Sequence, residues 1–389
     1  YSNSTGGNNT AVGMNAMNAN TTGDYNVAVG SLALDANTTA DHNTAIGYIA
    51  LSANTTGANN SALGTYALDV NTTGGNNTGL GYGALSENTT ASNNTAVGYK
   101  SLESNTTGTR NTAIGSGSLD ANTTADSNTS CGFNNLTSNT TGANNSAFGD
   151  NALYANTTAS NNTAVGFQAM LSNTTGFNNV AVGSLTLDAN TTGDKNTAVG
   201  QGALGANTTA DNNTAVGQGA LQTATTGGSN TAVGVDALSA NTTGVLNTAS
   251  GTTAMLSNTT GSRNAAFGSE ALALNTTGDY NCAFGKATLY TNTTGDNNTA
   301  YGTGALFANT TANNNTAVGY EALKSNTTGD KNVAVGAYAL DANTTAQGNT
   351  AIGYNTLTDC TGEANTGCGR QAMPSMTTGI QNSAFGYDS

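Results

Sequence analysis

The residues with the most regular chemical signature are the asparagines of Asn-X-Thr tripeptides, the acceptor sequence for N-glycosylation. The tripeptide returns as Asn-Thr-Thr in nearly every copy of a 17-residue repeat and is interrupted only at Ala224, Cys360 and Met376. Glycans at one per repeat would sheath the molecule, which requires these asparagines to project outward at a turn. The competing interpretation is a stacked turn whose side chains hydrogen-bond one another. The candidate acceptors are Asn20, Asn37, Asn54, Asn71, Asn88, Asn105, Asn122, Asn139, Asn156, Asn173, Asn190, Asn207, Asn241, Asn258, Asn275, Asn292, Asn309, Asn326 and Asn343.

Other chemistry has weaker support. Cys360 and Cys368 fall in the one irregular region and form a possible disulfide. The single histidine, His42, has no nucleophile beside it, so we expect neither an enzyme nor a cofactor. Calcium could bind a series of aspartates that recur at one variable position, but the glycine-rich nonapeptide of calcium-binding β-rolls is absent, and a solvated acidic edge is favoured. Those aspartates are Asp24, Asp41, Asp194, Asp211, Asp279 and Asp330.

The composition excludes several classes of protein. Charged residues make up 8% of 389 residues, and the net charge is −14 with only 8 Lys and Arg, which argues against nucleic-acid and anionic-membrane partners. No segment reaches the roughly 18 consecutive apolar residues of a membrane span. The 51 glycines lack a three-residue period and there is 1 proline, which excludes collagen.

One repeat accounts for the whole chain. The phrase Asn-Thr-Ala-Val-Gly begins at Asn9, Asn26 and Asn43 and continues at the same spacing, giving 22 repeats. We number repeat positions from that first Asn, as in the copy NTAVGYEALKSNTTGDK that starts at Asn315. The regular array spans residues 1–348, and residues 349–389 form irregular terminal coils of the same array, where one repeat is a residue short.

The repeat predicts an all-β protein, a β-solenoid (parallel β-roll) with one coil per repeat and almost no helix. The repeat is too short for a pair of helices, and its Asn, Thr and Gly residues are poor helix formers. Thr-Ala-Val is typical of a short strand and Asn-Thr-Thr-Gly of a turn. Because one coil cannot bury a core alone, stability must come from stacking on its neighbours.

Each repeat position suggests a role in the coil. Positions 4 and 9 are apolar, and we expect them to form the core ladders. Positions 3 and 5 are Ala and Gly on the opposite strand face, which indicates close approach of another backbone, either in the same coil or, as we favour, around a trimer axis. Position 5 is always Gly and is the sterically demanded one, whereas position 15 accepts Ala, as at Ala40. The Asn at position 1 fits an interior hydrogen-bonded ladder.

The phrase Asn-Val-Ala-Val-Gly, at 26–30, 179–183 and 332–336, resembles the head repeat of trimeric autotransporter adhesins. The full repeat is similar to arrays in phage tail-fibre and bacterial surface proteins. The resemblance covers essentially the whole chain and implies a left-handed parallel β-roll. The repeat is longer than the adhesin head coil, so the roll could be wider or differently handed.

We therefore expect a structural extracellular fibre, the shaft or head of a phage tail fibre or surface adhesin, at a cell or virion surface. Its partners would be itself, as a homotrimer or an end-to-end filament, and a cell-surface or glycan receptor. The chain begins and ends within a repeat, which predicts an excerpt of a longer array or end-to-end stacking. Attachment would use variable positions 6, 7, 10, 16 and 17, where we expect exposed aromatics: Tyr48, Tyr99, Phe167 and Tyr320.

Two alternatives to an attachment fibre stay open. One is a self-assembling extracellular filament, possibly N-glycosylated. The other is an ice-binding solenoid. Ice-binding solenoids use outward threonines separated by one residue, whereas the two adjacent threonines of Asn-Thr-Thr would face opposite ways in a strand.

Overall fold

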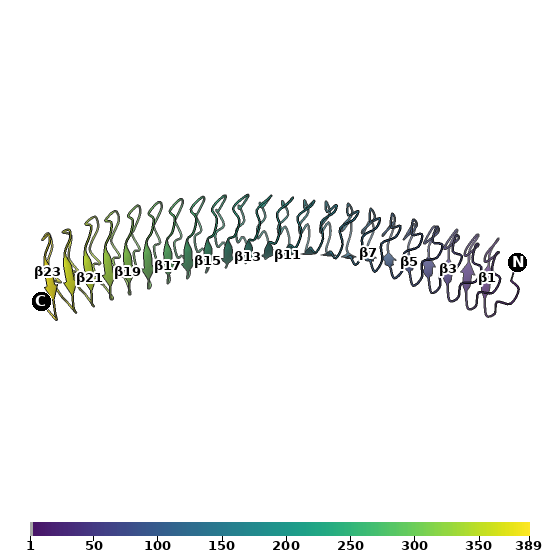
Figure 1. The fold of residues 1–389 in the computed structure, drawn as a ribbon, viewed down its shortest axis with the longest axis horizontal. Coiled ribbons are helices and arrows are strands. Elements are labelled where there is room, and N and C mark those ends of the chain that lie inside the picture. Colours follow the sequence, from purple (N-terminus) through teal and green to yellow (C-terminus); the bar gives the residue numbers. More distant parts are fainter. Residues whose placement is uncertain (1–2) are drawn as a thin grey trace. The chain divides into compact units, whose positions relative to one another are not determined.

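The computed structural model describes residues 3–389, in two compact units that meet in sequence at Lys195 and Asn196. No described residue is helical. In each unit the chain winds as a parallel β-solenoid with one coil per 17-residue repeat, which confirms the predicted fold class (Figure 1).

Every coil contributes one three-residue strand at positions 2 to 4. The first unit contains β1 (Thr10–Val12), β2 (Val27–Val29), β3 (Thr44–Ile46), β4 (Ser61–Leu63), β5 (Thr78–Leu80), β6 (Thr95–Val97), β7 (Thr112–Ile114), β8 (Thr129–Cys131), β9 (Ser146–Phe148), β10 (Thr163–Val165) and β11 (Val180–Val182). The second contains β12 (Thr197–Val199), β13 (Thr214–Val216), β14 (Thr231–Val233), β15 (Thr248–Ser250), β16 (Ala265–Phe267), β17 (Cys282–Phe284), β18 (Thr299–Tyr301), β19 (Thr316–Val318), β20 (Val333–Val335), β21 (Thr350–Ile352), β22 (Thr366–Cys368) and β23 (Ser383–Phe385).

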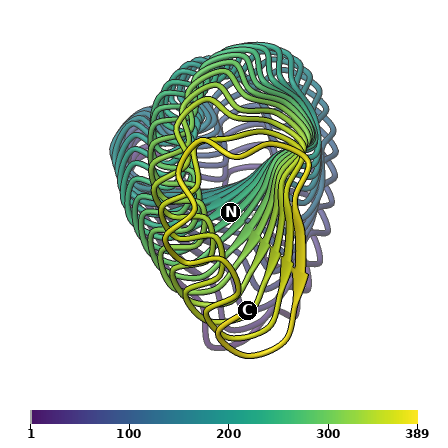
Figure 2. The same cartoon turned by 90° about the vertical axis from the view of Figure 1, so that its left-hand side faces the viewer.

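Within each unit consecutive strands pair in parallel, position for position, as in Thr163 with Val180. Figure 2 shows the coils of the second unit, green to yellow, superposed with their strands along one side. The register continues across the shortened repeat, where Thr350 pairs with Thr366 and Ile352 with Cys368. The irregular residues 349–389 therefore continue the stack of the second unit.

The corners of each coil are made by residues with left-handed backbone. Positions 7, 9 and 17 have positive φ in residues with side chains, for example 53° at Leu34 and 59° at His42. This conformation is uncommon outside glycine, and Asn is among the residues that tolerate it best. The frequent Asn at position 17 is therefore a sequence signal for a left-handed corner, which the turn assignment overlooked.

The strand face that is buried in the core is the opposite of the one we expected. Positions 3, 8 and 9 are buried, and the Leu at position 9 forms the largest buried column. Position 4, expected in the core, instead faces outward, as at Leu63 and Phe148. The interior has room only for Ala opposite Leu: a Cβ placed on Gly79, at position 3, would lie 3.4 Å from Leu68 Cδ1.

Since position 3 is filled by the chain's own core, the expectation that it faces partner chains is wrong. Ala317 is completely buried within its own unit. In one coil position 3 is the polar residue Ser130, and it has a hydrogen-bond partner within the core. Ser118 Oγ, at position 8, donates to Ser130 Oγ over 2.6 Å. A small residue at position 3 thus reflects the narrow coil interior and gives no information about a trimer axis.

The glycine at position 5 is sterically required, as predicted. Gly319 has φ +137°, and a Cβ there would lie 2.6 Å from the carbonyl carbon and oxygen of Gly336 in the next coil. Position 15 differs, because Gly329 has no left-handed φ and Ala occupies the same position at Ala40 and Ala312. Stacking backbone on backbone at position 5 explains why that glycine is invariant within the array.

Candidate functional site

The strands of each unit present an outward surface of uniform composition. We call positions 2 and 4 of the strands the outer strand face. Position 2 is mostly Thr and position 4 mostly Val, Ile, Leu or Phe. The position 4 residues are widely exposed, for example Leu63 at 45% and Val233 at 41%. Neither position carries a charged residue in any strand, although the chain has a net charge of −14.

Three of the four cysteines lie on the outer strand face. Cys282 occupies position 2, and Cys131 and Cys368 occupy position 4, all partly exposed. Cys360 lies inside the coil at position 12, where its Sγ is 3.5 Å from the Gly362 oxygen. All four cysteines are free, so the possible disulfide between Cys360 and Cys368 is not formed. Burial raises the pKa of the Cys282 and Cys360 thiols above the usual value.

The asparagines at position 12 form a buried ladder, which corrects the expectation that they project outward. Asn37 Nδ2 donates to Asn20 Oδ1 over 2.9 Å and to the Ala40 oxygen over 3.1 Å, and both asparagines are fully buried. A glycan attached to this nitrogen would occupy the interior of the coil. The burial recurs at every candidate acceptor: Asn20, Asn37, Asn54, Asn71, Asn88, Asn105, Asn122, Asn139, Asn156, Asn173, Asn190, Asn207, Asn241, Asn258, Asn275, Asn292, Asn309, Asn326 and Asn343.

A glycan sheath requires position 12 asparagines that project outward, and the structure has none among the candidate acceptors. The expectation that position 12 is exposed while position 1 is buried is therefore wrong, because both columns are buried. Position 1 is an interior ladder, as expected. Asn43 Nδ2 donates to the Gly57 oxygen over 2.9 Å, and its Oδ1 accepts from the Asn60 backbone N–H over 2.8 Å. The two columns differ in their partners: position 12 bonds to the side chain of the adjacent coil as well as to backbone, as in Asn37, whereas Asn43 at position 1 bonds to backbone groups.

The aspartates at position 16 are hydrogen-bonded, which makes the acidic edge more ordered than the expected solvated edge. Asp41 Oδ1 accepts from the Asp24 backbone N–H over 2.8 Å, and Asp330 Oδ1 accepts from the Asn313 N–H over 2.7 Å. Among residues 3–389, no group of three or more His, Cys, Asp or Glu side chains could hold a metal ion. The aspartates thus connect successive coils.

A second set of aspartates lies at position 10, where the coil is half-buried. Desolvation by burial raises the pKa of these carboxyls above the usual 3.8, and nearby backbone N–H groups oppose the shift. In Asp69 and Asp120, Oδ1 is buried and has no hydrogen-bond partner. The set with a raised pKa consists of Asp69, Asp120, Asp188 and Asp341.

Exposed aromatic side chains gather at positions 6 and 7, shortly after the strand of each coil. Tyr48, Tyr99, Phe167 and Tyr320 are exposed there, as expected. Rings of successive coils contact one another, as in Tyr82 and Tyr99, whose centroids lie 5.6 Å apart. In the second unit Tyr320, Tyr338 and Tyr354 form a similar series, which we call the tyrosine track; its centroids are 5.4 and 6.1 Å apart.

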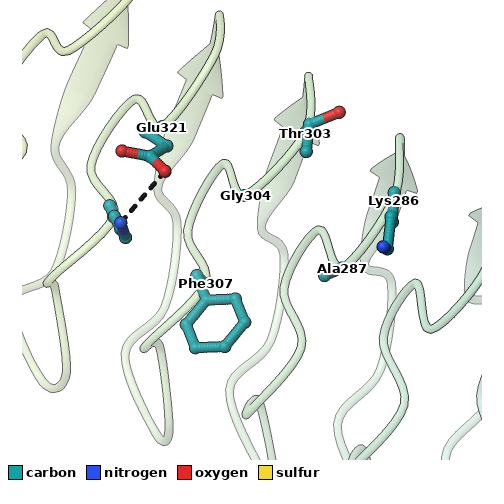
Figure 3. A pocket seen from close by; sticks show the side chains of 7 residues that line it. Lys286, Ala287, Thr303, Gly304, Phe307 and Glu321 are labelled. Carbon is teal, nitrogen blue, oxygen red and sulfur yellow. Dashed lines mark ion pairs between the residues drawn. The ribbon is translucent and has the colours of Figure 1, made fainter.

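A hollow of about 440 Å³ opens in the second unit at positions 6, 7 and 10 of three successive coils (Figure 3). We call it the basic hollow; it is lined by Lys286, Ala287, Thr303, Gly304, Phe307, Glu321 and Lys324. Lys324 Nζ and Glu321 Oε1 form an ion pair 3.0 Å apart. The hydrogen bond to Glu321 raises the pKa of Lys324, and one from Tyr320 to the same carboxylate raises the pKa of Tyr320.

No protein-family model matches the chain, and no curated protein is significantly similar to it. Among residues 3–389 the structure contains no helix with the length and apolar character needed to cross a bilayer. The arguments about function therefore rest on the outer strand face, the aromatic corner and the basic hollow.

Proposed function

We propose that this protein is a structural fibre component, the shaft or head of a phage tail fibre or surface adhesin, which assembles from several copies through the outer strand face and mediates attachment. The observation that carries the proposal is the uncharged, exposed apolar column at position 4, repeated coil after coil. Large contiguous apolar surfaces on soluble proteins commonly mark interfaces.

The energetics of the face favour association. Burying a Val, Leu, Ile or Phe side chain completely contributes about 1.5–3 kcal/mol, so covering a residue about 40% exposed contributes roughly 0.6–1.2 kcal/mol per coil. Eleven such coils contribute on the order of 7–13 kcal/mol, comparable to the ~4–15 kcal/mol cost of association. The second unit carries strands of the same composition, so its own outer strand face contributes a comparable amount.

The occupant that suits this face is a second copy of the same chain. A face without charge avoids the like-charge repulsion that two chains of net charge −14 would otherwise meet. Two β-sheets pack face to face about 10 Å apart when their inner side chains are apolar or small. The resemblance to adhesin heads and tail fibres favours three copies around a common axis.

The test places charge on the face and measures mass by analytical ultracentrifugation. The double variant Val216→Asp, Val233→Asp puts two carboxylates at position 4 of adjacent coils. The matched control, Thr209→Asp, Thr226→Asp, adds the same charge at position 14, which is exposed at the turn. We expect the wild type and the control to sediment as multiples of 38.3 kDa and the face variant as the monomer. A wild-type monomer at micromolar concentration would reject the proposal.

A second candidate, ice binding, gains one observation from the structure. The outward strand positions are 2 and 4, so Thr and an apolar residue are separated by one residue on a regular face. Phe148, Phe267 and Tyr301 interrupt the flatness of that face, which favours self-assembly. Inhibition of ice recrystallisation by the wild type, lost in the Val216→Asp, Val233→Asp variant, would support the second candidate instead.

A further inference from the structure

In the basic hollow of the second unit a concave surface, an aromatic ring and positive charge coincide on an acidic chain. Lys286 and Lys324 are two of only 8 Lys and Arg residues. Glu321 balances Lys324, and Lys286 has no ion pair with a described residue. The hollow thus carries one net positive charge in a protein whose net charge is −14.

The lower side of the hollow is aromatic, and it is rigid. Phe307, at position 10, stacks on Tyr290 of the preceding coil with centroids 5.2 Å apart and planes 4° from parallel. Figure 3 shows the Phe307 ring below Gly304, between the sides that carry Glu321 and Lys286. The electron-rich face of a ring attracts the C–H groups of a sugar, and its flat shape matches that of a pyranose.

The space exists because position 7 of this coil has no side chain. Gly304 has φ +67° and lies between Ala287 and Glu321 at the same position in adjacent coils. The backbone around it is fixed, since the Gly304 N–H donates to the Lys286 oxygen over 3.1 Å and the Glu321 N–H donates to the Thr303 oxygen over 3.0 Å. The volume, about 440 Å³, lies in the range of small-ligand sites.

We propose that the basic hollow binds an acidic sugar unit of a linear polysaccharide, and that the tyrosine track carries the neighbouring sugar rings. The ring of the sugar would lie on Phe307, and its carboxylate would accept charge-assisted hydrogen bonds from Lys286. Thr303 and Glu321 offer a hydroxyl and a carboxylate for the sugar hydroxyls. Tyr320 lies next to Glu321, so the tyrosine track begins where the hollow ends.

The inference rests on the attachment role proposed above and names its ligand class. An aromatic series bordered by cations suits a chain with an occasional carboxylate. At its far end Arg370 lies between Tyr354 and Tyr387, with its guanidinium 5.9 and 5.2 Å from the two ring centroids. A densely charged polyanion such as a nucleic acid would be repelled by the rest of the chain.

The test is isothermal titration calorimetry with a hyaluronan hexasaccharide, a linear chain with a carboxylate on every second sugar, and with maltohexaose as the neutral probe. Gly304→Asn fills the hollow, and its Cβ would lie 3.3 Å from Glu321 Cγ, a flexible side chain that can shift. The backbone accepts Asn, because Asn occupies position 7 with left-handed φ at Asn134 (50°) and Asn151 (56°). We expect this variant to weaken binding of the hyaluronan hexasaccharide at least about tenfold. Lys286→Gln should weaken binding roughly fivefold and reduce its salt dependence. The control Lys331→Gln, at exposed position 17, should stay within about twofold of the wild type.

Several outcomes would overturn the inference. These are the absence of saturable binding of the hyaluronan hexasaccharide, equal affinity for maltohexaose, or an unchanged affinity in Gly304→Asn with an unchanged unfolding midpoint. The test is separable from assembly, because none of the residues that line the hollow lies at position 2 or 4. The Val216→Asp, Val233→Asp variant should therefore retain binding while losing its multimeric mass, and Gly304→Asn should show the reverse.

Discussion

Removing one rung of the position 12 ladder tests whether buried amide hydrogen bonds stabilise the stack. Asn309 Nδ2 donates to Asn292 Oδ1 over 2.8 Å and to the Ala312 oxygen over 3.1 Å, and its Oδ1 accepts from Asn326 Nδ2 over 3.1 Å. In Asn309→Ala the Ala312 oxygen keeps the bond from Asn298 Nδ2, at 2.8 Å. Asn292 Oδ1, by contrast, loses the donor provided by Asn309.

The expected magnitude follows from that inventory. A buried acceptor left unsatisfied costs about 1–3 kcal/mol, and the space left by the amide adds a smaller cost. We therefore expect local opening of these coils to become easier by about 2–3 kcal/mol, a roughly 30- to 150-fold loss of protection. The loss should be confined to adjacent coils, because a solenoid repeat contacts only its neighbours.

Native-state hydrogen exchange followed by mass spectrometry measures this coil by coil. Thr311→Ala is the control, since Thr311 is exposed at position 14 of the same turn, and it should change protection by less than about 0.5 kcal/mol. Equal protection in Asn309→Ala and in the wild type would refute the idea that the ladder stabilises the stack. The Ala224 already present at position 12 predicts that its own coil exchanges faster than its neighbours.

Three further changes test other parts of the coil. Gly319→Ala should destabilise by about 2–4 kcal/mol through backbone strain and contact with the next coil, and Gly319→Val by at least as much. Gly329→Ala should cost less: its Cβ would also contact the next coil, at the Ala346 oxygen, but Gly329 has no left-handed φ and the stack accommodates Ala312 at the same position. Equal unfolding midpoints for Gly319→Ala and Gly329→Ala would show that left-handed strain at position 5 is not what makes its glycine invariant. Burial raises the folded-state pKa of Asp120, so this carboxyl lowers stability as pH rises from about 3.8 through the folded pKa. Asp120→Asn should therefore raise the unfolding midpoint at pH 7 relative to wild type and raise it less at pH 3. A larger gain at pH 3 than at pH 7 would contradict this explanation. Maleimide should label Cys368, on the outer strand face, quickly in the monomeric Val216→Asp, Val233→Asp variant and slowly in the assembly. Cys360 is buried and should react slowly in both. Rapid labelling of Cys360 would place position 12 outside the coil.

Much of the architecture was readable from the spacing alone. The unbroken repeat determined the coil length, and the invariant Gly at position 5 indicated backbone stacking, which the contact from Gly319 to Gly336 explains. The interior role of position 1 also followed from the sequence. Asn-Thr-Thr left two interpretations open, and pattern alone could not decide between them because an acceptor tripeptide and a bonded turn have the same letters.

The tertiary structure decided which way each side chain points. Hydrophobicity alone predicts that the Val side chain of the Thr-Ala-Val strand is buried and the Ala exposed. The interior beside Leu68 and its equivalents, however, has room only for a residue as small as Ala. The Val, Ile and Phe residues at position 4 therefore face outward. Three left-handed corners per coil set that orientation and turn position 12 inward, and only the frequent Asn at position 17 signals one of them. Repeat length and glycine positions depend on contacts between identical positions in adjacent coils. Such contacts make the same residue recur at a fixed spacing, so the sequence alone reveals them. The direction of a strand face depends on the path of the whole coil, which a linear pattern does not contain.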